Sequence, residues 1–234
     1  MERGLILVQI SAVIFDLDNV LFNEQDYINA AYRNIAVFLS KRFRLQEEQV
    51  YQKLLNDLQK KTSRYPHLFN DLLTDLGLDQ VTLPDILKIY ASTNINLKLY
   101  PDAENLLSAL KNQKIKLVLV TNGNVETQRN KVGLLKIEKY FDIIVYAREL
   151  GKENEKPNPK VYRLIFQTLG SKPEEAISIG DNPYTDFLGA KKIGVRTVRL
   201  LSGEFKDVRL SEEYEADLSV GNLEEFSKII AQSN

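Results

Sequence analysis

The chain has 234 residues, no cysteine and one histidine, His67. Without cysteine there is no disulfide framework, no cysteine nucleophile and no Cys-ligated zinc or iron–sulfur site. One histidine excludes a multi-histidine metal site, and no serine-elbow pattern stands near His67 to complete a Ser-His-Asp triad. The 31 basic and 32 acidic residues nearly cancel, so no basic surface for a nucleic acid polymer is expected. Substrate recognition must therefore be local.

The apolar stretch Gly4–Phe15 has the character of a short secretory h-region, but it lacks a small-residue cleavage site. It also runs directly into Asp16-Leu17-Asp18, where a signal peptide would end in a neutral, removable segment. No apolar run reaches the roughly 18 residues of a membrane-spanning helix. We therefore expect a soluble, cytoplasmic protein with no membrane partner.

The first expected strand is Ala12–Phe15, and the long interval that follows shows helical spacing only. A crossover between parallel strands needs only a dozen or more residues, so this interval is far too long for one. The helices expected in it are Tyr27–Phe43, Glu47–Lys61, Tyr65–Leu76 and Pro84–Ala91. We interpret residues 23–98 as an all-helical cap subdomain inserted after the first strand. The alternative is a single domain with extra helices laid on the sheet.

Short apolar runs and helical patterns alternate through the rest of the chain. The expected strands are Ile115–Val120, Ile143–Tyr146, Ala176–Ile179 and Val195–Leu200, with Ala216–Val220 as an edge strand. The expected helices are Asp102–Lys111, Lys160–Leu169 and Gly189–Ile193. Continuous apolar runs are typical of strands buried on both faces of a parallel sheet. The pattern predicts an α/β core of residues 1–22 and 99–234, a doubly wound Rossmann-like parallel sheet.

Polar residues follow several of these strands. Asp16 and Asp18 follow the first, Thr121-Asn122-Gly123 the second and Asp181 the fourth, while Lys156 precedes a helix. In an open parallel sheet the ligand site lies at the carboxyl ends of the strands. Carboxylates, a hydroxyl, backbone amides and an ammonium at one edge indicate an oxygen-ligand Mg²⁺ site beside an anion-binding site.

Each of these residues can also be interpreted more simply, as a helix cap, a turn residue or a loop residue. Asp186, five residues after Asp181, can be interpreted as an acidic residue in the first turn of a helix, where the helix dipole favours it. The pair Asp16 and Asp18 differs, because neighbouring carboxylates repel each other unless they share a cation or a proton. Joint placement of all these groups at strand ends favours a functional site.

Four segments resemble, in order, the four motifs of the haloacid dehalogenase superfamily. They are Asp16–Leu21, Val120–Gly123, Lys156–Pro159 and Gly180–Asp186. The helical interval lies where one branch of that superfamily has its helical cap. The resemblance therefore covers nearly the whole chain.

The resemblance implies a role for each motif residue. Asp16 is implied to be the nucleophile that forms an aspartyl-phosphate, and Asp18 the general acid and base. Thr121, Lys156 and the backbone amides of Asn122 and Gly123 are implied to hold the phosphoryl oxygens of the substrate.

The implied cofactor is Mg²⁺, bound by Asp16, the backbone carbonyl of Asp18, Asp181 and Asp186, the last directly or through water. The expected activity is Mg²⁺-dependent hydrolysis of a small phosphomonoester, which makes the protein a phosphoric monoester hydrolase. The expected partner is a small phosphorylated metabolite, and the expected assembly is a monomer or a homodimer.

Two positions depart from the family pattern. The first motif continues as Asn19-Val20, where relatives often have Gly-Thr or Asp-Thr, and Asn122 stands where many have another small polar residue. Neither Asn19 nor Val20 supplies the nucleophile or the acid, so we expect altered local packing and retained activity.

Four other functions share part of this pattern. A phosphomutase of the same superfamily keeps all the motif residues and differs through its cap. A 2-haloacid dehalogenase needs neither the metal nor a second acid, so Asp18, Asp181 and Asp186 argue against it. A response-regulator receiver would need a phosphorylated Asp at a strand end within residues 23–98, where only helical patterns occur. The intact motif residues argue against an inactive binding module.

Overall fold

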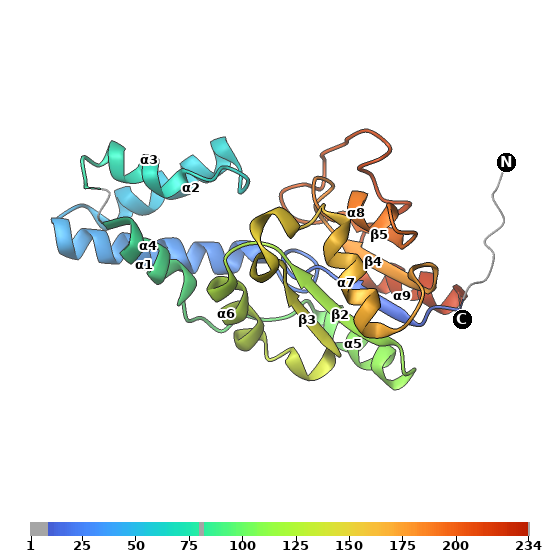
Figure 1. Ribbon diagram of the computed structural model, residues 1–234. Helices are drawn as coiled ribbons and strands as arrows, with labels where there is room; N and C mark the ends of the chain where they lie inside the picture. The colour runs from blue at the N-terminus through green and yellow to red at the C-terminus, as the bar shows by residue number, and fades with distance from the viewer. Residues whose placement is uncertain (1–8, 80–81, 234) are drawn as a thin grey trace. The chain divides into compact units, whose positions relative to one another are not determined.

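The structure is a computed structural model that describes residues 9–79 and 82–233. It contains a six-stranded sheet in the order β3-β2-β1-β4-β5-β6, in which every pairing is parallel (Figure 1). The strands are β1 (Ala12–Phe15), β2 (Lys116–Thr121), β3 (Ile143–Tyr146), β4 (Ala176–Gly180), β5 (Arg196–Leu200) and β6 (Leu218–Val220). The predicted α/β fold is confirmed, including the edge strand near the carboxyl terminus.

Both faces of β1 are buried, which explains its unbroken apolar sequence. Ala12 and Ile14 belong to a core cluster with Val161 and Ile165 of helix α7 (Pro159–Leu169). Phe15, on the opposite face, makes an edge-to-face contact with Phe226 of α9 (Leu223–Ser233), with ring centroids 6.2 Å apart. The sheet is therefore covered on both sides, as in a doubly wound fold.

The helices that complete this unit include four 3-10 helices. They are α5 (Pro101–Asn112), α8 (Leu188–Lys191) and the 3-10 helices η2 (Glu138–Tyr140), η3 (Ala147–Leu150), η4 (Lys152–Asn154) and η5 (Pro173–Glu175). Helix α7 begins after Asn158, whose side chain accepts a hydrogen bond from the Lys160 amide, and ends at Gly170 in the left-handed conformation.

Residues 24–97 form the helices α1 (Glu24–Phe43), α2 (Glu47–Lys61), α3 (Leu68–Asp75) and α4 (Leu83–Ala91). They enclose an apolar core of their own, in which Ile35, Leu39, Leu54 and Leu72 are fully buried. These residues recur at helical spacing, as the sequence pattern required.

Contacts divide the chain into two units, and the division differs from the sequence interpretation at one helix. Residues 126–134, most of α6 (Val125–Leu135), group with residues 24–97 and not with the sheet. The Lys131 ammonium lies 2.9 Å from a Glu24 carboxylate oxygen, and the Asn130 side chain donates to the Thr93 carbonyl at 2.7 Å. These polar contacts within the helical unit account for the grouping. That residues 23–98 act as a cap stays a prediction.

None of the described helices is long and apolar enough to cross a lipid bilayer. Residues 4–8 of the amino-terminal apolar stretch lie outside the described residues.

Asn19 has a left-handed backbone, with φ at 57°, which explains why asparagine is tolerated at this departure from the family motif. Its carbonyl accepts a hydrogen bond from the Ser202 hydroxyl at 2.6 Å. A side chain on Gly203 would place its Cβ 2.6 Å from Cγ of Asn19, so the turn after β5 packs closely on this loop.

We expect Asn19→Val to lower the free energy of unfolding by about 1–2 kcal/mol, because a β-branched residue is strained at positive φ. Asn19→Gly, which relieves the backbone restriction, is expected to stay within about 1 kcal/mol of the wild type. Chemical denaturation of the three proteins measures both differences. Equal stability of the valine and glycine variants would contradict this explanation of the loop.

Candidate active site

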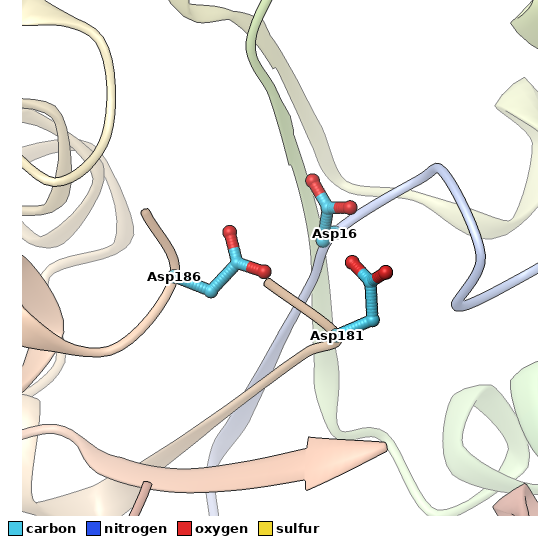
Figure 2. A group of neighbouring side chains, drawn as sticks. All are labelled: Asp16, Asp181 and Asp186. Carbon is cyan, nitrogen blue, oxygen red and sulfur yellow. The ribbon is translucent and has the colours of Figure 1, made fainter. Parts of the chain in front are cut away.

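Three carboxylates converge at the carboxyl end of the sheet. Asp16 follows β1, Asp181 follows β4, and Asp186 lies in the next turn; one carboxylate oxygen from each lies within 4.8 Å of the others (Figure 2). The Asp16 amide donates to the Ile179 carbonyl at 2.9 Å, so pairing of β1 with β4 continues up to Asp16. The parallel register of neighbouring strands therefore brings these residues together, as expected from their positions at strand ends.

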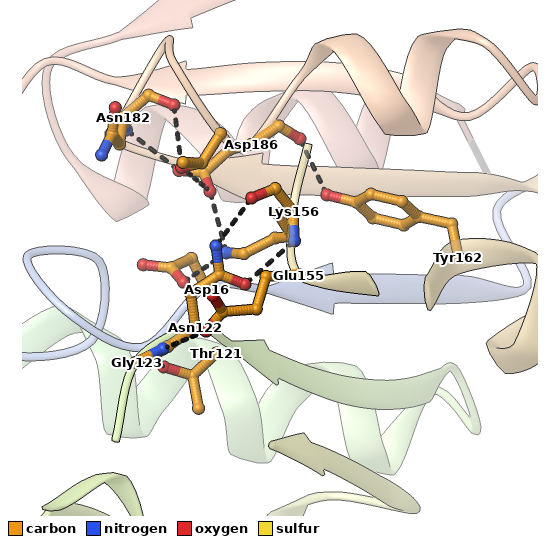
Figure 3. A network of polar contacts seen from close by, with 10 residues as sticks. Asp16, Thr121, Asn122, Gly123, Glu155, Lys156, Tyr162, Asn182 and Asp186 are labelled. Atoms are coloured by element: carbon orange, nitrogen blue, oxygen red, sulfur yellow. Dashed lines mark hydrogen bonds and ion pairs between the residues drawn. The ribbon is translucent and has the colours of Figure 1, made fainter. Parts of the chain in front are cut away.

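Asp186 is held through both its carboxylate and its backbone carbonyl. Its carboxylate accepts a hydrogen bond from the Asn182 amide at 2.9 Å, and its backbone carbonyl accepts one from the Tyr162 hydroxyl at 2.9 Å (Figure 3). A Cβ on Gly180 would lie 2.3 Å from the Asp186 carboxylate, so β4 must end in glycine. Asn182 lies within the fourth motif, but its contact with Asp186 was not predicted. Tyr162 was not singled out, because a position in an apolar helical pattern gives no sign of such a contact.

Lys156 lies between two of the carboxylates. Its ammonium nitrogen is 2.5 Å from Asp16 Oδ1 and 2.8 Å from Asp186 Oδ1, and its side chain is only 3% exposed (Figure 3). The expected convergence of Lys156 with the carboxylates is therefore present in the fold. An ammonium in this position offers a charge-assisted donor to an anion bound beside Asp16.

The electrostatics of the site are dominated by crowded, buried charge. Burial raises the pKa of Asp16 to about 7; the Lys156 ammonium opposes this rise, while the charges of Asp186 and Asp18 add to it. Burial alone would lower the pKa of Lys156, but the charges of Asp16 and Asp186 outweigh it and hold that pKa above its ordinary value. Three neighbouring carboxylates, only two of which contact the ammonium, leave an excess of negative charge, which a divalent cation would offset.

Asp18 is half-buried two residues after Asp16, and its backbone pairs with that of Phe22 in an isolated bridge. Its carboxylate lies outside the group of three formed by Asp16, Asp181 and Asp186. This arrangement is compatible with a separate acid–base role for the Asp18 side chain. Its contribution to metal binding through the backbone carbonyl stays a prediction.

The loop after β2 is tied to the loop that carries Lys156. Thr121 is buried at the end of the strand, and the Asn122 side chain bonds both the amide and the carbonyl of Lys156, at 3.0 and 2.8 Å. The Gly123 amide donates to Glu155 Oε1 at 2.9 Å (Figure 3). In this structure the Gly123 amide is therefore engaged by a carboxylate, whereas the sequence interpretation assigned it to the substrate phosphate.

A family model for haloacid dehalogenase-like hydrolases matches residues 13–200 of the chain. The chain belongs to this family. Glyceraldehyde 3-phosphate phosphatase of Methanopyrus kandleri is 33% identical over 205 residues, which cover 85% of this chain and 87% of that one. Phosphoserine phosphatase of Thermus thermophilus is 30% identical over 158 residues, covering 68% and 61%.

Among solved structures, the HAD phosphatase from Thermococcus onnurineus has a TM-score of 0.67 and 26% identity, covering 94% of this chain and 98% of that one. These matches, which extend over most of the chain, agree with the resemblance found in the four motifs. The expected enzyme class, a phosphoric monoester hydrolase of the haloacid dehalogenase-like family, is confirmed.

Proposed function

We propose that this enzyme hydrolyses a small phosphorylated metabolite in two steps, through an aspartyl-phosphate on Asp16. The observation that carries the proposal is the cluster of Asp16, Asp181 and Asp186 at the carboxyl end of the sheet, with the Lys156 ammonium paired to Asp16 and Asp186. A carboxylate nucleophile beside a buried ammonium suits attack on an anionic phosphoryl group, whose charge would otherwise repel it.

The donor set supports Mg²⁺ as the cofactor. Asp16, Asp181 and Asp186 supply hard oxygen ligands that lie close together, and the backbone carbonyl of Asp18 is a further proposed ligand. The excess negative charge of the cluster favours a divalent cation. When bound, Mg²⁺ would neutralise charge on the phosphoryl oxygens and on the carboxylates around them.

In the first step an Asp16 carboxylate oxygen bonds to phosphorus and the bond from phosphorus to the ester oxygen breaks. Asp18, acting as general acid, gives its proton to the departing oxygen. In the second step water attacks phosphorus, Asp18 takes the proton of that water, and the bond to Asp16 breaks, which releases inorganic phosphate. Thr121 and Lys156, with the Asn122 amide, are proposed to hold the phosphoryl oxygens through both steps.

The substrate is proposed from the relatives. Glyceraldehyde 3-phosphate and phosphoserine, named in the phosphatases of Methanopyrus kandleri and Thermus thermophilus, are both small phosphomonoesters and are the first candidates. We propose that residues 23–98 act as a cap that selects the leaving group. A cytoplasmic location and a monomeric or homodimeric state stay predictions.

A panel of phosphorylated metabolites that includes these two compounds, together with para-nitrophenyl phosphate, tests the proposed function through release of inorganic phosphate. Halide release from 2-haloacids and transfer of phosphate between hydroxyls of a sugar phosphate test the two alternatives in the superfamily. The presence of Asp181 and Asp186 beside Asp16 favours the metal-dependent phosphate chemistry over metal-independent dehalogenation.

Removal of Mg²⁺ is expected to abolish the phosphatase activity. With excess EDTA, para-nitrophenyl phosphate hydrolysis is expected to fall about 100-fold or more, because the charge of the carboxylate cluster is then uncompensated. Added Mg²⁺ is expected to restore the rate. Activity that survives EDTA unchanged would exclude the metal from the reaction.

A further inference from the structure

Two loops of the active site are joined by reciprocal hydrogen bonds. The Asn122 side chain bonds the backbone of Lys156 at both its amide and its carbonyl, and the Glu155 side chain accepts from the backbone amide of Gly123. Two consecutive residues of one loop are thus fixed to two consecutive residues of the other. We call these four residues, Asn122, Gly123, Glu155 and Lys156, the loop clamp.

The clamp connects two groups that are proposed to bind the same phosphoryl group. Thr121 precedes Asn122 directly, and Lys156 is itself a member of the clamp. The strands alone fix Thr121, which ends β2, but Lys156 lies in the connection between η4 and α7, outside regular structure. The hydrogen bonds of the loop clamp therefore fix the position of the Lys156 backbone relative to Thr121 at the end of β2.

Within the loop clamp, the Glu155 carboxylate places a negative charge close to the groups that are proposed to bind phosphate. A carboxylate near a phosphate-binding loop repels the substrate unless its charge is offset. The Arg148 guanidinium supplies the offset, since its Nε and Nη2 donate to the two Glu155 oxygens at 3.0 and 3.1 Å. The Glu155 side chain is 12% exposed and that of Arg148 is 41% exposed, so the carboxylate is the more buried partner of this ion pair.

We propose that Glu155 is a positioning residue, which holds Lys156 and Thr121 at the separation that phosphoryl binding requires, with Arg148 keeping its carboxylate in place. This inference rests on the proposed function, because it assigns a task to the phosphate-binding groups. Glu155 acts through the backbone amide of Gly123 and does not touch the metal cluster of Asp16, Asp181 and Asp186.

The proposal predicts that substitution of Glu155 changes the affinity for a phosphate-like anion but leaves the response to Mg²⁺ unchanged. In Glu155→Ala the affinity for orthovanadate, a phosphate-like anion, is expected to fall about tenfold or more, and kcat/KM for para-nitrophenyl phosphate to fall at least as much. The concentration of Mg²⁺ for half-maximal activity is expected to stay within about twofold, because the metal ligands are untouched. In Glu155→Gln an oxygen remains for the Gly123 amide, so most of the lost vanadate affinity is expected to return.

The control is Glu153→Ala, which removes an exposed carboxylate from the neighbouring helix η4; this carboxylate accepts a hydrogen bond from the adjacent Asn154 side chain. Wild type, the two Glu155 variants and this control are compared by calorimetric titration with vanadate, by steady-state kinetics and by thermal unfolding. Vanadate affinity lowered in Glu155→Ala, restored in Glu155→Gln and unchanged in Glu153→Ala would support the proposal.

Unchanged vanadate affinity in Glu155→Ala would overturn the proposal, as would a glutamine variant as impaired as the alanine variant. A parallel loss of thermal stability, Mg²⁺ response and vanadate affinity would also overturn it, since that result indicates general damage to the fold. A wild-type protein that hydrolyses no phosphomonoester would instead contradict the proposed function, and the direct vanadate titration would still decide whether Glu155 positions the anion site.

Discussion

Asp16→Asn is expected to lower kcat for phosphomonoester hydrolysis by roughly 10³-fold or more, because an amide oxygen cannot replace the carboxylate as nucleophile. The fold is expected to persist. The substituted side chain still offers an oxygen to the Lys156 ammonium, which lies 2.5 Å from Asp16 Oδ1, and one of three crowded carboxylates loses its charge. Steady-state kinetics with para-nitrophenyl phosphate measure the effect on kcat.

A matched control for this substitution is Asp207→Asn, an identical change at an exposed position in the connection between β5 and β6. Its activity is expected to equal that of the wild type. Thermal unfolding of both variants checks that the loss in Asp16→Asn does not come from unfolding. Substantial activity in a folded Asp16→Asn protein would show that another group attacks phosphorus.

Lys156→Met is expected to lower kcat/KM by roughly 10²- to 10³-fold, since it removes a buried donor to the developing charge while keeping a side chain of similar length. It also leaves Asp16 and Asp186 without the ammonium that lies 2.5 and 2.8 Å from them. Breaking a buried ion pair in this way is expected to lower the free energy of unfolding by about 3 kcal/mol in metal-free buffer.

Lys152→Met is the control for this prediction, because Lys152 is an exposed lysine in the neighbouring helix η4. Urea denaturation without metal and kinetics with Mg²⁺ are measured on the same preparations. A Lys156→Met protein that keeps wild-type kcat/KM would remove Lys156 from the phosphate-binding groups, whatever its stability.

Much of the core follows from local pattern. The run Ala12–Phe15 is buried on both faces, so its apolar residues do not alternate, and this alone indicates a central parallel strand. Once the strands are parallel, their carboxyl ends share one edge, which brings Asp16 and Asp181 together without knowledge of any side-chain contact. The convergence of the carboxylates was therefore predictable from the sequence.

Contacts between distant loops were not predictable in the same way. The Gly123 amide meets Glu155 because the loop after β2 and the loop before α7 have particular conformations, and no periodicity encodes such a bond. Similarly, α6 follows β2 in the chain but groups with the helical unit through Lys131 and Asn130. Polar partners of this kind depend on tertiary geometry, which explains why the sequence interpretation placed α6 in the core.

The most direct test of the mechanism is detection of the phosphate on Asp16. Wild type and Asp18→Asn are mixed with para-nitrophenyl phosphate, whose leaving group departs without a general acid, so that loss of Asp18 should slow mainly the hydrolysis of the intermediate. The mixtures are quenched with acid and reduced with borohydride, which converts an acyl phosphate to an alcohol. Peptide mass spectrometry is expected to find homoserine at position 16, with more of it in Asp18→Asn. Reduction at another residue, or none during active turnover, would contradict the aspartyl-phosphate mechanism.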